Sequence, residues 1–247
     1  MTRLLVLCPL AEEAVGVVAR LAGREAARSE HAALAWKGRL AGRDVLVCVT
    51  GDGPARAGAA ARAAALRGRA FVVAGVAGAL ARDLRPGDLV AATAAYDQAS
   101  GARADAPRAD VVAVASGGRA APVLTALRVA ASPEERARLA AAWTPPPAAV
   151  DLETWPLVAA AATAGLPWAV LRAVSDAAEE ELPPYLEASR RGDGSLDRGA
   201  VARAALARPW TLPTLARLRR RLARCSSLLA DACEGLAASG WPEGPPG

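Results

Sequence analysis

The sequence predicts a single α/β domain in which a central, mixed β-sheet is flanked by helices. Residues 166–174 form an almost unbroken apolar run that ends at Ser175, which is typical of a strand covered on both faces. Residues 149–153 form a second strand-like run, and the alanine-rich stretch between the two suits a packed helix. The chain has 247 residues and is 53% apolar, so it can bury the core of one large domain.

The first quarter of the chain predicts a strand and a helix, then a hairpin, then a second helix. In order, these elements are expected at residues 4–8, 12–21, 34–40 with 45–49, and 54–66. The turn sequence Ala-Gly-Arg-Asp at 41–44 separates two apolar runs and therefore predicts the hairpin. Pro54 suits the first turn of a helix, where a backbone N–H has no partner to lose.

The middle of the chain predicts short strands around one exposed loop and one helix. Strands are expected at residues 71–74, 89–94, 111–115 and 121–124, the loop at 99–108 and the helix at 133–143. Ser132 and Glu135 have the spacing of a capping box at the start of that helix. The small residues at 75–79 either let a flat ring lie against the backbone or allow a close helix–strand contact.

The last third of the chain predicts helices and a tail. Helices are expected at residues 157–163, 201–206 and 212–229. In the last of these, leucines and Cys225 form one stripe and arginines cover the rest. That pattern fits a surface helix packed by its apolar stripe, and it also fits a basic helix that rests on anionic lipid. Residues 237–247 are rich in Gly and Pro, so we expect a disordered tail after a domain spanning 1–236.

Composition excludes several classes of function. The net charge is +5, and the basic residues are scattered except near 217–224, so no nucleic-acid partner is expected. His31 is the only histidine, and no two cysteines form a Cys-x-x-Cys pair, so neither a metal site nor a Ser-His-Asp triad is expected. Two of the four cysteines lie in apolar strands, which indicates a reducing, cytoplasmic compartment.

Two acids follow predicted strands at the point where each strand ends. Glu153 follows the strand at 149–153, and Asp176 follows the strand at 166–174. In open α/β sheets, ligands bind at the carboxyl ends of the strands. An acid after a strand is also a common helix N-cap or first-turn residue. Two such acids at consecutive strand ends favour a ligand site over capping alone.

Three ordered motifs resemble the purine nucleoside phosphorylase and methylthioadenosine nucleosidase superfamily. Residues 150–153 (V-D-L-E) resemble its V-D-M-E motif, and residues 171–176 (L-R-A-V-S-D) resemble its v-R-x-i-S-D motif. Residues 74–80 and 85–90 resemble its G-x-A-G-x-L and v-G-D-v-V segments. These motifs span about half of the chain, and the resemblance implies a nucleoside phosphorylase-like fold.

The resemblance implies a role for each matching residue. Asp176 would protonate or hydrogen-bond the purine at N7, and Glu153 would hold the ribose hydroxyls. An acid at position 176 helps because the departing base needs a proton. A carboxylate at position 153 helps because negative charge stabilises the oxocarbenium character that the ribose develops. Leu152 replaces the motif's methionine and keeps an apolar contact with the ribose. Further substrate contacts are expected from Ser175, Gly75, Val76, Ala77 and Gly78.

The attacking group is left open between water and phosphate. Residues 10–13 (L-A-E-E) resemble the M-E-E-E segment of the nucleosidases, which places a water-binding role on Glu13, with Glu12 as the alternative. Two acids in the first turn of a helix are also explained by capping electrostatics. Phosphate as a co-substrate would need a cationic cradle, for which the candidates are Gly51, Gly53 and Arg56. We favour water, because a carboxylate beside the attacking group opposes an anion.

Residues 176–183 and 208–213 are most similar to the hopanoid-associated phosphorylases, which sharpens the expected function. We expect an enzyme without a cofactor that removes adenine from a 5′-substituted adenosine, with adenosylhopane as the substrate. Trp155 either lines an apolar pocket for the 5′ substituent or packs in the core. The alternatives are a methylthioadenosine or adenosylhomocysteine nucleosidase, and a catalytically idle nucleoside-binding protein. The family implies a homodimer or larger homo-oligomer, and the basic helix adds a candidate contact with the inner membrane face.

Overall fold

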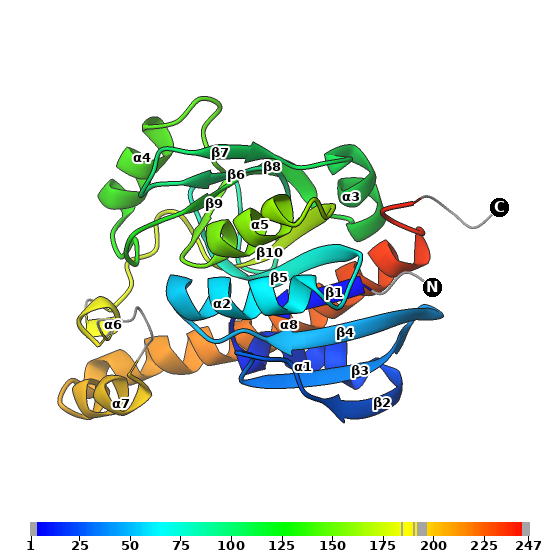
Figure 1. Cartoon of the computed structure of the whole chain (residues 1–247). Coiled ribbons are helices and arrows are strands. Elements are labelled where there is room, and N and C mark those ends of the chain that lie inside the picture. The colour runs from blue at the N-terminus through cyan, green and yellow to red at the C-terminus, as the bar shows by residue number, and fades with distance from the viewer. Residues whose placement is uncertain (1–3, 184, 190, 192–196, 244–247) are drawn as a thin grey trace.

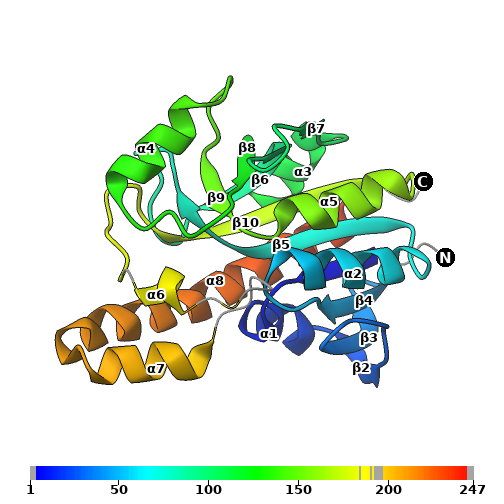
Figure 2. The same ribbon diagram turned by 60° about the vertical axis from the view of Figure 1, so that its left-hand side comes forward.

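The computed structural model describes residues 4–183, 185–189, 191 and 197–243. Within these residues, ten strands form one sheet with helices on both of its faces (Figures 1 and 2). The strands are β1 (Leu4–Cys8), β2 (Ala22–Ala27), β3 (Leu34–Leu40), β4 (Arg43–Val49), β5 (Ala70–Ala79), β6 (Leu89–Asp97), β7 (Arg103–Asp105), β8 (Arg119–Thr125), β9 (Ala149–Asp151) and β10 (Trp168–Asp176). The helices are α1 (Ala11–Ala19), α2 (Pro54–Ala65), α3 (Ala109–Ser116), α4 (Pro133–Ala141), α5 (Thr154–Thr163), α6 (Tyr185–Ala188), α7 (Arg198–Leu206), the short 3₁₀ turn η1 (Pro209–Thr211) and α8 (Leu212–Ala238).

The sheet is mixed, as predicted, and part of it closes on itself. β5 lies between β1 and β10 and is parallel to both. β10 is antiparallel to β6, which is parallel to β8; β8 is parallel to β9, and β9 returns antiparallel to β5. Strands β5, β10, β6, β8 and β9 therefore form a ring. On the other side of β1, the sheet continues through β4 and β3 to β2.

The unbroken apolar strands are explained by cover on both faces. Along β1, Leu4, Val6 and Cys8 belong to one buried cluster, whereas Leu5 and Leu7 belong to the other. This alternation follows from the two-residue period of a strand. Helices α1 and α8 pack on the first face, and α2 and α5 pack on the second (Figure 1). All four cysteines are free and buried.

Two predictions for the strands and loops are corrected by the structure, and one strand was not predicted. Residues 111–115 were expected to form a strand because valine favours strands, but they lie in helix α3. Contacts of α3 with α8 and β6 override that local preference, and only Val112 of the helix is buried. The loop expected at 99–108 contains β7, which pairs with β6. The exposed strand β2 was not predicted, because its alanine-rich sequence has no apolar alternation.

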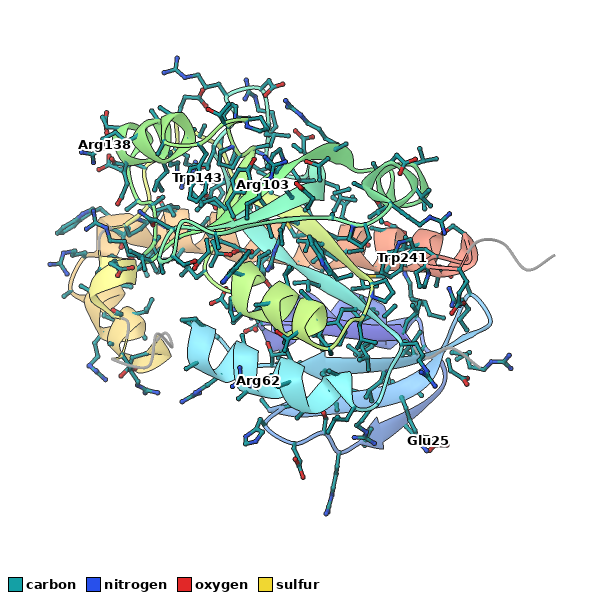
Figure 3. All side chains as sticks on the ribbon, turned by 45° about the horizontal axis from the view of Figure 1, so that its top comes forward. Glu25, Arg62, Arg103, Arg138, Trp143 and Trp241 are labelled. Carbon is teal, nitrogen blue, oxygen red and sulfur yellow. The ribbon has the colours of Figure 1, made fainter. Side chains whose placement is uncertain are left out.

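The prediction of a disordered tail is wrong for residues 237–243. Helix α8 continues to Ala238, because Leu229, Cys233 and Leu236 extend its buried stripe. Trp241 follows the helix, is only 1% exposed and packs in the same cluster as β1 and α1 (Figure 3). Residues 244–247 lie outside the described part. Among the described helices, none is both long and apolar enough to cross a membrane.

Candidate active site

A cavity of about 390 Å³ lies where β1, β5, β9 and β10 end. Its walls come from segments far apart in the sequence, and they include the three predicted acids Glu13, Glu153 and Asp176. Strand pairing brings the motifs together, because Gly78 of β5 is in register with Asp176 of β10 on one side and with Val150 of β9 on the other. The residues lining the cavity also include Val76, Ala77, Gly78, Leu152 and Ser175.

Glu13 is a buried carboxyl group held by two backbone amides. It lies in the first turn of α1 and is 1% exposed. The N–H of Val76 donates to Oε1 at 2.8 Å, and the N–H of Leu10 donates to Oε2 at 2.7 Å. Burial raises the pKa of Glu13 to about 7, although Arg172 and the two backbone N–H groups act in the opposite direction. A carboxyl with a pKa near 7 is suited to accept a proton from an attacking water.

Helix α8 fixes the turn of α1 that carries Glu13. The Ser226 hydroxyl accepts from the Gly16 N–H at 2.9 Å and donates to the Glu13 carbonyl at 3.2 Å. The two helices touch so closely that a Cβ at Gly16 would lie 2.2 Å from the Ser226 carbonyl oxygen. Glycine is therefore required at position 16, because any side chain there would push α1 and Glu13 away from α8.

Asp176 ends β10 and has a polar partner on each carboxylate oxygen. Ser175 Oγ donates to Oδ1, and Arg136 Nη2 donates to Oδ2, each at 2.5 Å. The side chain is 7% exposed, and the carboxylate faces the backbone of Gly78. A Cβ at position 78 would lie 2.8 Å from Oδ2, so glycine at this position makes room for the acid.

Arg136 is a site residue that sequence reasoning did not identify. It lies in α4 and lines the cavity, yet only 1% of its side chain is exposed. Ser132 caps α4 as predicted by accepting from the Glu135 N–H at 3.2 Å, whereas the Glu135 carboxylate accepts from Ala131 instead of Ser132. No feature of the sequence distinguishes Arg136 from Arg138, which lies at the outer edge of the same helix (Figure 3).

Asp151 and Arg172 form a buried ion pair that joins two of the sequence motifs. Arg172 Nη2 lies 2.6 Å from Asp151 Oδ2, and the two side chains are 1% and 3% exposed. Thr154 Oγ1 accepts from Arg172 Nε at 3.0 Å and from Nη2 at 2.7 Å. The guanidinium lies so close to Gly75 that a Cβ there would be 1.9 Å from Nη1. These contacts connect the ends of β9 and β10, which lie on opposite sides of β5, and place a positive charge behind Glu13.

Glu153 lies at the N-terminus of α5 and is 9% exposed. Its Oε1 accepts from the backbone N–H of Gly53 at 3.0 Å. The acid therefore contacts the turn after β4 as well as the cavity. Leu152, beside it in the sequence, is half-buried and also lines the cavity.

The structure places five of the other predicted site residues outside the cavity wall. The described residues that line the cavity do not include Gly51, Gly53, Arg56 or Trp155, but they do include Asp52. The Gly53 N–H donates to Glu153, and Arg56 is exposed with its Cδ facing Gly51. The half-buried Trp155 packs against the buried cluster under α2 and α5. Gly75 contributes from behind the wall through the space that it leaves for Arg172.

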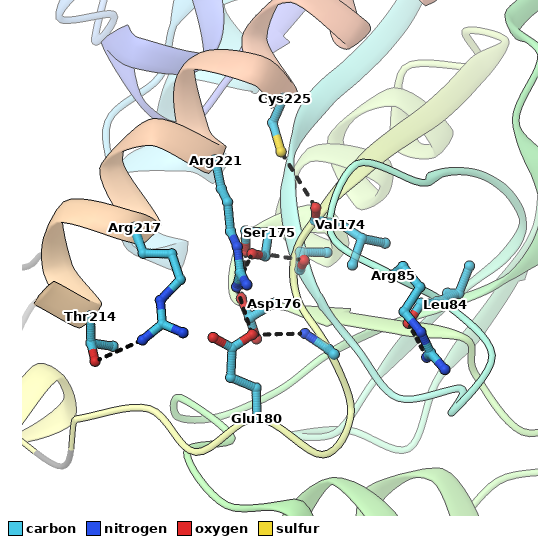
Figure 4. Close-up of polar contacts among 12 residues, drawn as sticks. Leu84, Arg85, Val174, Ser175, Asp176, Glu180, Thr214, Arg217, Arg221 and Cys225 are labelled. Carbon is cyan, nitrogen blue, oxygen red and sulfur yellow. Dashed lines mark hydrogen bonds and ion pairs between the residues drawn. The ribbon is translucent and has the colours of Figure 1, made fainter.

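Helix α8 also holds the end of β10 (Figure 4). Arg221 Nη1 donates to Glu180 Oε2 at 2.6 Å and to the Ser175 carbonyl at 3.3 Å. The Cys225 thiol donates to the Val174 carbonyl at 3.4 Å. Two backbone carbonyls immediately before Asp176 are thus held by one helix. Glu180 belongs to the acidic run 179–181, so one member of that run has a specific partner.

The fold and the cavity define an α/β protein with an acid-lined cavity at the ends of its strands. In the described part of the chain, no group of three or more His, Cys, Asp or Glu side chains is arranged to hold a metal ion. The chain belongs to the phosphorylase superfamily, whose family model matches residues 3–192. No curated protein matches it at the sequence level.

Solved structures with the same fold include two nucleosidases and a futalosine hydrolase. The S-adenosylhomocysteine nucleosidase of Streptococcus pyogenes, in complex with 5-methylthiotubericidin, is 16% identical with a TM-score of 0.75 over 98% of each chain. The 5′-methylthioadenosine/S-adenosylhomocysteine nucleosidase of Neisseria meningitidis, in complex with methylthio-immucillin-A, is 17% identical with a TM-score of 0.76, over 97% of this chain and 100% of that one. The futalosine hydrolase of Helicobacter pylori is 14% identical with a TM-score of 0.72, over 96% of this chain and 97% of that one. Family and fold together support an enzyme that cleaves N-glycosidic bonds.

Proposed function

We propose that this chain cleaves the N-glycosidic bond of a 5′-substituted adenosine and releases adenine. One observation carries the proposal: Glu13, Glu153 and Asp176 come from three distant segments and line one cavity. The small residues Val76, Ala77 and Gly78 line the same cavity beside them and leave room for a flat base.

In this reaction each acid has a separate task. Asp176 gives a proton to N7 as the electron pair of the C1′–N9 bond moves onto the base. Glu153 accepts hydrogen bonds from the ribose hydroxyls and places negative charge near the oxocarbenium-like sugar. Water attacks C1′, and Glu13 accepts the proton that this water loses. The products are free adenine and a ribose with a hydroxyl group at C1′.

Water is the proposed nucleophile because Glu13 lines the cavity and the candidate phosphate ligands do not. Asp52 adds a further acid to the wall. Adenine release should then be the same in phosphate-free buffer, and Glu13→Gln should stop it. Release that rises with phosphate concentration and saturates, with a sugar 1-phosphate as product, would instead identify a phosphorylase that uses Gly51, Gly53 and Arg56.

The proposed substrate is adenosylhopane, which would give ribosylhopane by hydrolysis or phosphoribosylhopane by phosphorolysis in hopanoid biosynthesis. Support comes from the part of α8 that extends past the sheet beside α7 (Figures 1 and 2). There, Leu206, Trp210 and Leu212 are 74%, 73% and 43% exposed, close to the exposed arginines of α8. An apolar surface with basic neighbours suits contact with the cytoplasmic face of the inner membrane. The resemblance to this family implies that the chain forms a homodimer or a larger homo-oligomer.

A second candidate is a nucleosidase for methylthioadenosine or adenosylhomocysteine, because two of the solved structures above are such enzymes. A third is a nucleoside-binding protein without catalysis. Adenine release from adenosylhopane, methylthioadenosine and adenosylhomocysteine, compared by kcat/KM, separates the three. Binding of all three without adenine release would support the third.

The role of Asp176 is tested by Asp176→Asn, which keeps the shape of the side chain but cannot deliver the proton. Base release should fall by about a hundredfold or more, the usual contribution of general acid catalysis. Glu179→Gln, on the exposed part of the following loop, is the matched control. A loss below about tenfold in Asp176→Asn would remove the residue from the acid role.

A further inference from the structure

We propose that a groove between helices α1 and α8 binds a long apolar 5′ substituent of the substrate. The inference rests on the proposed function and names the class of nucleoside that the site takes. The groove has a volume of about 440 Å³ and lies beside the candidate active site. Glu12 and Leu222 line both the groove and the acid-lined cavity, so the groove continues directly from that cavity.

Two helices that run in the same direction form the groove. Helices α1 and α8 lie side by side (Figures 1 and 2). Along the pair, the Gly16 N–H donates to Ser226 Oγ, and Arg20 lies one turn further from the cavity. There, Arg20 Nη2 is 2.6 Å from Asp231 Oδ1, and Nη1 is 3.0 Å from Glu234 Oε2. The groove is therefore open toward the cavity and bounded by ion pairs at its other end.

The lining of the groove is mostly apolar. Val15 and Ala223 line it from opposite helices, and Val15 is 63% exposed. A single exposed valine needs no explanation on most surfaces, but this one faces a groove that joins the cavity of the proposed reaction. The charged residues of the lining lie at its two ends, with Glu12 and Arg219 near the cavity and Arg20 far from it. An apolar chain would therefore meet apolar atoms along the middle of the groove.

The cavity alone has little room for a large 5′ substituent. Its volume of about 390 Å³ is near the lower end of the range for small-molecule sites, about 300–1,000 Å³. Adenine beside Asp176 and ribose beside Glu153 would occupy it. From Glu12 to Ala19, α1 rises by about 10 Å at 1.5 Å per residue. An extended chain of about eight carbons has the same length, so the groove fits a substituent of that size.

The energetics of burial give the expected size of the effect. Full burial of one methylene group strengthens binding about fourfold. Val15 and Ala223 are exposed, so the groove is open to solvent along one side and the gain should be about twofold to threefold per methylene. The substituent takes no part in breaking the C1′–N9 bond. Its contacts are therefore equal in the ground state and the transition state, and they should lower KM without changing kcat.

The test uses a series of 5′-alkylthio-5′-deoxyadenosines with unbranched chains from methyl to dodecyl. For the wild type, kcat/KM for adenine release should rise about twofold to threefold per methylene from butyl to octyl, through KM, and then level off. A kcat/KM that does not depend on chain length would overturn the proposal. It would do so equally if a second copy of the chain covers the groove.

A variant that shortens the groove tests its position. Ala19 is exposed and lines the end of the groove far from the cavity, so Ala19→Trp should fold and fill about one helical turn, about 5 Å. The gain should then stop about four carbons earlier than in the wild type. Ala238→Trp, at the exposed end of α8 and outside the groove, is the matched control and should keep the wild-type dependence. The same dependence in Ala19→Trp would overturn the groove as the binding place.

A second variant and a binding measurement cover the remaining outcomes. Val15→Glu places a charge in the middle of the groove and should remove the gain with chain length, which tests the proposal if Ala19→Trp does not fold. A wild-type chain that releases adenine from none of the series would overturn the proposed function. The groove is then tested by the Kd of the same series for the wild-type chain. A Kd that falls with chain length would support the groove, and a constant Kd would overturn it.

Discussion

Replacing Glu13 by Gln should change the pH dependence of stability by an amount that follows from its pKa. Burial raises the pKa of Glu13 from 4.5 to about 7 in the folded chain. Below pH 4.5 the Glu13 carboxyl is protonated in both the folded and the unfolded chain, so its ionisation does not lower the free energy of unfolding. Between these values the folded chain binds the proton more tightly, so stability falls as the pH rises. At about 1.4 kcal/mol per unit, the loss amounts to about 3 kcal/mol above pH 7.

Glutamine does not titrate, so Glu13→Gln should lack this loss. Its amide has one oxygen for the two backbone donors of Leu10 and Val76, which costs about 1–3 kcal/mol at every pH. The difference in unfolding free energy between variant and wild type should therefore shift by about 3 kcal/mol in favour of the variant between pH 4 and pH 8. Urea unfolding at both pH values measures that shift.

The same pKa predicts how activity depends on pH. Glu13 accepts a proton only when ionised, so base release by the wild type should rise through about pH 7. Glu181→Gln, on an exposed loop, controls for the loss of a carboxylate as such. A stability difference that stays constant from pH 4 to pH 8 would refute the raised pKa. Activity that is unchanged by Glu13→Gln would refute the role as base.

Three further predictions follow from the contacts of the site. Glu153→Gln should impair turnover of a ribonucleoside far more than that of its 2′,3′-dideoxy analogue; equal losses would show that the acid does not bind the hydroxyls. Asp151→Asn should destabilise the fold by about 3 kcal/mol in urea unfolding, because it leaves Arg172 buried without its carboxylate; a loss below about 1 kcal/mol would contradict a strong pair. Gly78→Ala should lower activity about a hundredfold, because its Cβ would lie 2.8 Å from Asp176 Oδ2 and displace the acid; unchanged activity with the chain folded would contradict that positioning.

The sheet could be predicted from the sequence wherever a strand is buried on both faces. Such strands leave apolar runs that no exposed segment imitates, as in residues 166–174, which lie within or beside β10. The hairpin was predicted because its turn is local. Helix α3 was not, because residues 111–115 have the composition of a strand and become helical only through contacts with α8 and β6.

The acids of the site could be anticipated because they follow strands, but their partners could not. Glu13, Glu153 and Asp176 each lie at the start of a helix or the end of a strand, and such positions can be recognised in a sequence. Arg136 and Ser226 act through tertiary contact alone. Their roles depend on where α4 and α8 pack, and neighbouring residues of the same type, such as Arg138 and Ser227, look identical in the sequence.

The closed ring of strands limits how copies of this chain could associate. Strands in the ring have partners on both sides, so the long free edge of the described sheet is β2 (Figure 1). That edge carries Arg24 and Glu25 and has an irregular register between Ala22 and Glu25. Charge and irregularity at an edge discourage a second chain from adding its own strand. The homodimer proposed above would therefore form through helices and loops, and the described sheet should stay protected against fibre-like growth.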